Sequence, residues 1–112
     1  MPTVNIFHAE SGVAQIESAI SELRRFIAEQ LTCGAIKLRP EEVSIRLIRV
    51  QSGSFMIAPI EIEITAHAFP ERIQQQDEIC LHIRTFLRRT MGAGQDVRVW
   101  LLLPQLGHSW EE

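Results

Sequence analysis

The spacing of apolar residues changes its period along this 112-residue chain, and it changes in the same order twice. Apolar and polar residues alternate over Thr3–Ala9, which is the period of a half-buried β-strand. Over residues 13–31 the apolar positions recur at steps of three and four, which predicts one face of a long helix. Alternation returns over Val43–Val50. These segments predict a first β-α-β unit over about residues 2–50.

The second half of the chain follows the same plan. Alternation over Ile60–His67 predicts a strand, Pro70 fits the first turn of a helix, and the glycine-rich segment 92–94 ends that helix. Its apolar stripe is expected to comprise Ile73, Cys80, Ile83 and Leu87. A last strand over Val97–Leu103 completes a second unit at about residues 56–104, followed by a short tail. A helix between two strands favours parallel pairing of those strands.

The two units together predict one α/β domain over residues 1–112, an α+β sandwich in which a four-stranded sheet carries two helices on one face. The other face would mix polar and apolar side chains, namely Ser44, Arg46, Ile48, Glu61, Glu63, Thr65, His67, Trp100 and Leu102. Such a face is too polar for a core and too apolar for free exposure. We therefore expect a symmetric oligomer that packs sheets around a shared axis, with a solvent-facing sheet as the alternative.

Charge and cysteine content narrow the classes of partner. The net charge is −3 and the pI about 5.8, so we expect no binding to nucleic acid. The nearest basic cluster, Arg84 with Arg88 and Arg89, stands late in a predicted helix, where cations complement the helix dipole. Cys33 and Cys80 show neither a disulfide framework nor metal-ligand spacing, which favours the reducing cytoplasm. No apolar run is long enough to predict a membrane helix.

Three features together resemble the tautomerase superfamily: Pro2 directly after Met1, the doubled β-α-β plan, and Arg46 on the second strand. The plan is similar to that of macrophage migration inhibitory factor and 5-carboxymethyl-2-hydroxymuconate isomerase. The chain looks closest to small bacterial tautomerase-like proteins of unassigned function. The resemblance extends from Pro2 to about Pro104 and implies a trimer with the helices outside.

The resemblance also implies an activity. In the superfamily the methionine is removed and the proline becomes an amino-terminal general base, so Pro2 is the expected catalytic residue. An α-amino group titrates near ~8, and burial or a nearby cation lowers that value. An amine poised near neutral pH can move a proton between carbon and oxygen of an enolisable 2-keto acid. Such a reaction needs no cofactor or metal.

Three further residues would bind the small carboxylate substrate. Arg46 matches an arginine that binds the substrate's carboxylate in 4-oxalocrotonate tautomerase, and a guanidinium fork suits that group. The alternative for Arg46 is an ordinary ion pair with Glu61 or Glu63 on the adjacent strand. Phe55 and Trp100 resemble aromatic residues that line the pocket in members of the superfamily.

Departures from the superfamily pattern leave other functions open. Gly12 stands where a second arginine is expected, and the chain has no tyrosine. A substrate with one carboxylate is therefore favoured over one with two. The alternatives are a tautomerase fold without activity, or a non-catalytic ligand-binding or assembly module such as a ferredoxin-like regulatory domain, which has an antiparallel sheet.

Overall fold

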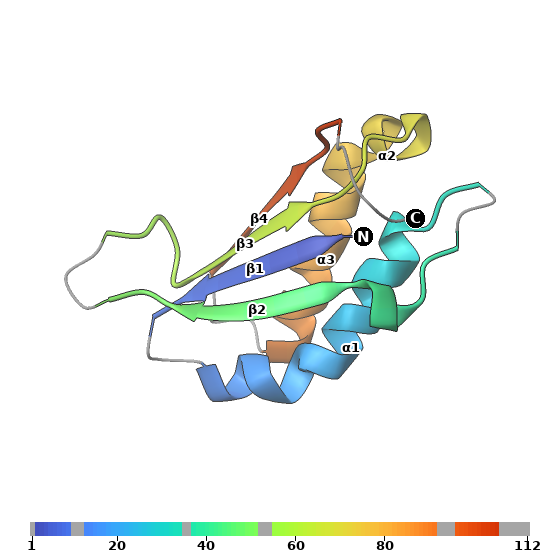
Figure 1. The fold of residues 1–112 in the computed structure, drawn as a ribbon. Coiled ribbons are helices and arrows are strands. Elements are labelled where there is room, and N and C mark those ends of the chain that lie inside the picture. Colours follow the sequence, from blue (N-terminus) through green and yellow to red (C-terminus); the bar gives the residue numbers. More distant parts are fainter. Residues whose placement is uncertain (1, 10–12, 35–36, 52–54, 92–95, 106–112) are drawn as a thin grey trace.

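The computed structural model describes residues 2–9, 13–34, 37–51, 55–91 and 96–105. Its elements, in chain order, are β1 (Thr3–His8), α1 (Val13–Leu31), the short 3-10 helix η1 (Pro40–Glu42), β2 (Ser44–Arg49), β3 (Ile60–Thr65), α2 (Pro70–Gln74), α3 (Gln76–Met91) and β4 (Val97–Leu102). The four strands form one sheet, and the two long helices pack side by side against it (Figure 1). The predicted fold class is therefore confirmed.

The sheet has the strand order β2-β1-β3-β4. Within each β-α-β unit the strands pair in parallel, β1 with β2 and β3 with β4, as the sequence predicts. The two units join through an antiparallel pair of central strands, β1 and β3. This mixed pairing differs from the all-antiparallel sheet of the ferredoxin-like alternative, so that topology is wrong for this chain.

Alternation along the strands separates the two faces of the sheet. The face toward the helices is apolar and buried, and it comprises Val4, Ile6, Ile60, Ile62, Ile64, Val97 and Leu101. Opposite it lie the apolar stripes of the helices, with Ile16, Leu23, Ile27 and Leu31 from α1 and Ile79, Ile83 and Leu87 from α3. Two ring systems stack between the helices, Phe26 on Phe86, at a centroid distance of 4.5 Å. This packing fixes both helices on one face and leaves the other uncovered.

The second helix differs from the prediction because it is broken at Gln75, whose φ of −107° and ψ of 15° leave the helical range. The break divides it into α2 and α3 and shifts the phase of the first turn. Ile73, expected in the apolar stripe, is 53% exposed, whereas its neighbour Arg72 is only 1% exposed. Arg72 therefore takes the inward position that periodicity assigned to Ile73.

The hydrogen bonds of the buried Arg72 guanidinium explain why α2 directs Arg72, and not Ile73, into the core. Arg72 Nε donates to the carbonyl of Leu31 at 3.0 Å, and Nη1 donates to the carbonyl of His67 at 3.0 Å. The same guanidinium lies over the ring of Phe69, 4.7 Å from its centroid. Burying a charge requires such hydrogen bonds, and these tie the C-terminus of α1 to the segment that follows β3.

Candidate active site

Pro2 lies buried at the end of the sheet where β1 and β2 begin and where β3 and β4 end. Its carbonyl accepts a hydrogen bond from the Ser44 N–H at 3.1 Å. On the other side of β1, Thr3 pairs with Thr65. Pro2 is therefore held at the start of a central strand, where its backbone has little freedom.

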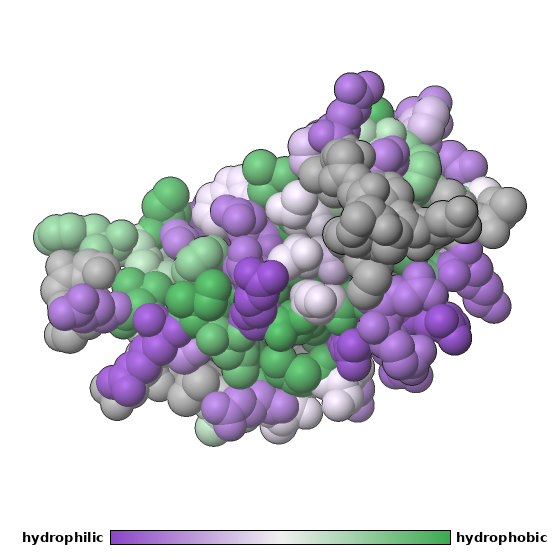
Figure 2. Space-filling model, in the orientation of Figure 1, coloured by the Kyte–Doolittle hydropathy of each residue, from purple (hydrophilic) through white to green (hydrophobic). Residues whose placement is uncertain are grey.

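A row of polar and aromatic residues crosses the uncovered face of the sheet. It crosses β1 at Asn5, two residues after Thr3. The strand register aligns Arg46 with Asn5, Asn5 with Glu63, and Glu63 with Trp100. Arg46 and Trp100 are exposed. Apolar and polar side chains mix over the side of the molecule seen in Figure 2. The predicted composition of this face is confirmed for its strand residues.

The order of the strands overturns one interpretation of Arg46. The alternative to substrate binding was an ion pair with Glu61 or Glu63 on an adjacent strand, but β1 lies between β2 and β3. Within the part of the chain that the structure describes, Arg46 forms no ion pair. Its guanidinium faces solvent beside Asn5, whose buried Oδ1 accepts no hydrogen bond from the described residues.

A hollow of about 420 Å³ opens at the outer edge of β2, at the strand end where Ser44 binds the Pro2 carbonyl. It lies between α1 and β2, and it is lined by Ile20, Arg24, Val43, Ser44, Ile45 and Arg46. Arg24 Nε donates to the carbonyl of Val43 at 2.8 Å, which holds a second guanidinium in this hollow. Sequence reasoning missed Arg24, because its position outside the apolar stripe of α1 is that of an ordinary solvated residue.

Phe55 and Trp100 do not lie beside Pro2 within one chain. Phe55 is fully exposed and follows β2 in the connection to β3, which projects from the end of the sheet opposite the N-terminus (Figure 1). The six residues of β1 separate the two ends by about 20 Å. Trp100 lies on the uncovered face of β4, with β3 between it and β1. One chain alone therefore does not assemble the four predicted site residues.

Neither cysteine has the character of a catalytic nucleophile. Both are free, and Cys33 is buried. Burial raises the pKa of the Cys80 thiol above its ordinary value of 9.0, with a smaller opposing effect from the Leu101 backbone. A thiol with a raised pKa stays protonated and unreactive near neutral pH.

The described residues contain no group of three or more His, Cys, Asp or Glu side chains placed to hold a metal ion. Gly12, where the superfamily pattern expects an arginine, falls outside the described residues. In the described part of the chain, no helix is both long enough and apolar enough to cross a membrane.

Solved structures share this fold. A macrophage migration inhibitory factor-like protein from Entamoeba histolytica has a TM-score of 0.64 at 10% identity, over 96% of this chain and 95% of its own. A 5-carboxymethyl-2-hydroxymuconate isomerase from Deinococcus radiodurans has a TM-score of 0.58 at 12% identity, over 99% of this chain and 88% of its own. A fused 4-OT described as a symmetric trimer has a TM-score of 0.62 at 12% identity, over 92% of this chain and 85% of its own.

These neighbours are members of the tautomerase superfamily, so the resemblance drawn from the sequence is confirmed for the fold. No protein-family model matches the sequence. No curated protein matches it either.

Proposed function

We propose that this protein is a tautomerase that moves a proton between carbon and oxygen of an enolisable 2-keto acid, with Pro2 as its general base. The observation that carries the proposal is the position of Pro2, buried at the start of a central strand in a fold shared with an isomerase and a 4-OT. The proposal requires that Met1 is removed, because only then is the proline nitrogen a basic secondary amine.

The proton transfer is balanced within one turnover. In the enol-to-keto direction, the neutral amine of Pro2 takes the proton from the enol hydroxyl while the carbonyl bond forms. The resulting ammonium then donates a proton to the neighbouring carbon, and a C–H bond forms. Pro2 returns to its neutral state. Burial of Pro2 at the sheet end would disfavour the ammonium form of its amine, which supports this role.

Arg46 would hold the carboxylate of the substrate, and Phe55 and Trp100 would supply apolar walls. A guanidinium gives a carboxylate two parallel charge-assisted hydrogen bonds, and Arg46 has no competing carboxylate among the described residues. Only one such arginine is assigned, and the chain has no tyrosine, which favours a substrate with a single carboxylate.

The site would be completed by a second copy of the chain within a homotrimer. Phe55 lies at the opposite end of the sheet from Pro2, so it can approach only the Pro2 of another copy. Two further observations support assembly. Trp100 and Leu102 are large apolar residues exposed on the uncovered face. The outer edge of β4 is capped by Arg84 and Gln76, which donate to the carbonyls of Val97 and Leu101. The cap that the described residues place on β2 lies beside its start, at Val43.

We also place this single-domain protein in the reducing cytoplasm, because Cys33 and Cys80 are both free thiols.

Ketonisation of enol-phenylpyruvate tests the activity. The protein is prepared so that its intact mass shows loss of Met1, and Pro2→Ala is prepared in the same way. We expect a rate well above that of buffer in the first and a large loss in the second. A matched control keeps Pro2 but retains an N-terminal extension, which turns the amine into an amide; it should also be inactive.

Equal rates in all three proteins would overturn Pro2 as the base for this substrate. The tautomerase fold would then serve ligand binding or assembly without this chemistry.

A further inference from the structure

A second, separate hollow of about 340 Å³ lies on the outer face of α3 and is lined by Arg84, Thr85, Arg88 and Arg89. It lies at the far end of the molecule from Pro2. Arg84 Nε donates to the carbonyl of Val97, the first residue of β4, at 3.0 Å, whereas Pro2 lies where β4 ends. Nothing in the proposed tautomerase reaction uses these residues.

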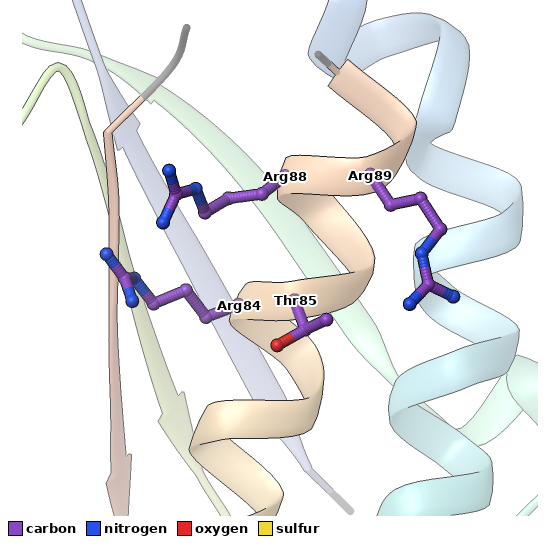
Figure 3. Close-up of a pocket in the computed structure, with 4 residues that line it drawn as sticks. All are labelled: Arg84, Thr85, Arg88 and Arg89. Carbon is purple, nitrogen blue, oxygen red and sulfur yellow. The ribbon is translucent and has the colours of Figure 1, made fainter. Parts of the chain in front are cut away.

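The side chains around this hollow are arranged on two sides of Thr85. Arg84 and Arg88 extend in the same direction, toward β4, and Arg89 extends toward α1 (Figure 3). The hydrogen bond to Val97 fixes the direction of Arg84. The hydroxyl of Thr85 is a further donor between the guanidinium groups. Guanidinium groups thus border the hollow on both sides of Thr85.

Negative charge nearby is insufficient to neutralise these arginines. One carboxylate, that of Asp96, is shared between Arg84 at 3.9 Å and Arg98 at 3.7 Å, and both distances are long. Arg88 and Arg89 form no ion pair with any residue that the structure describes. This hollow therefore has a local excess of positive charge, although the chain as a whole has a net charge of −3.

The helix dipole explains only part of this arrangement. Arg88 and Arg89 stand in the last turn of α3, where a cation is favoured. The dipole acts on the position of a charge along the helix and does not require a hollow between the side chains. Arg84 stands in an earlier turn, and its guanidinium is directed by a hydrogen bond to β4.

We propose that this hollow binds the phosphoryl group of a small soluble ligand. Arginine binds phosphate oxygens through two parallel hydrogen bonds, and Arg88 and Arg89 offer guanidinium groups with no partner in the described residues. The arginines that line the hollow all lie in the last two turns of α3, and the protein is acidic overall. Both facts favour a compact phosphate ester over a nucleic-acid strand, which needs an extended basic surface.

Titration calorimetry with pyrophosphate and with ribose 5-phosphate tests the site at low ionic strength. We expect saturable binding at one site per chain. The double substitution Arg88→Gln with Arg89→Gln should weaken it by about tenfold or more, since it removes two charge-assisted contacts. The matched control, Arg25→Gln with Arg39→Gln, removes two exposed arginines elsewhere, and it should leave the affinity unchanged.

Backbone amide shifts give an independent readout, because ligand binding should move the Thr85 amide resonance and leave that of Thr3 in place. Absence of saturable binding would overturn the proposal, as would an equal loss of affinity in the control. Tighter binding of a single-stranded oligonucleotide than of either small ligand would overturn the assignment to a small phosphate ester. All these measurements are independent of tautomerase activity.

Discussion

The carbonyl oxygen of Pro2 and the backbone N–H of Ser44 lie 3.1 Å apart and form the first hydrogen bond between β1 and β2. This bond joins the residue proposed as the base to the strand that carries Arg46, two residues further along. The distance between base and carboxylate-binding residue thus depends on the register of two neighbouring strands. A change that disturbs this end of the ladder should therefore affect both stability and activity.

Ser44→Pro removes that donor without altering Pro2. We expect the free energy of unfolding to fall by about 1 kcal/mol or more, because proline has no N–H and the Pro2 carbonyl loses its partner. Ser44→Ala keeps the N–H and should stay within about 0.5 kcal/mol of the unchanged protein. Urea unfolding monitored by circular dichroism measures both. Equal stability of the two variants would show that the bond contributes nothing.

Substitutions at the neighbouring residues Arg72 and Ile73 should lower the free energy of unfolding by very different amounts. Arg72→Met deletes the donors to the Leu31 and His67 carbonyls, so we expect a loss of about 2–4 kcal/mol in the free energy of unfolding. Ile73→Ala removes a side chain that is 53% exposed and should cost less than about 1 kcal/mol. The same unfolding measurement compares them. A larger loss for Ile73→Ala would restore the helical phase first expected from the sequence.

Cys80 gives a prediction that depends on pH. Burial raises the pKa of its thiol in the folded state, so the unfolded chain ionises Cys80 at a lower pH than the folded chain does. The resulting contribution to stability is complete below the unfolded pKa and is lost as pH rises through the folded value. Alkylation by iodoacetamide in a Cys33→Ala background should accordingly be slower than that of a free thiol at pH 8–9.

The unfolded protein in urea is the matched control for this alkylation, since it exposes the same thiol. Equal alkylation rates in the folded and unfolded states would contradict a raised pKa and a shielded thiol at Cys80.

Local patterns predicted most of the strands and helices because burial on one face imposes a period on the sequence. They could not predict the strand order, which depends on contacts between distant segments. For this reason the sequence suggested an ion pair between Arg46 and Glu63, although Asn5 lies between these two residues in the sheet. The break at Gln75 also had no local signal, so the inward turn of Arg72 was missed. The positions of Pro2 and Phe55 at opposite ends of the sheet likewise required the full topology.

Trp100 gives the sharpest test of the proposed trimer. It is 43% exposed on the uncovered face, where we expect a second copy to cover it. Trp100→Glu would place a charge in that interface, and burying an unpaired carboxylate is costly enough to dissociate the assembly. Leu81→Glu is the matched control, because Leu81 is 57% exposed on α3, on the helical side of the molecule.

Sedimentation equilibrium should give a trimer for the unchanged protein and for Leu81→Glu, and a monomer for Trp100→Glu. The monomer should also lose tautomerase activity although Pro2 is intact, because Phe55 of one copy would no longer reach the Pro2 of another. A Trp100→Glu protein that stays trimeric would exclude this face from the interface. A fully active monomer would show instead that one chain is sufficient for catalysis.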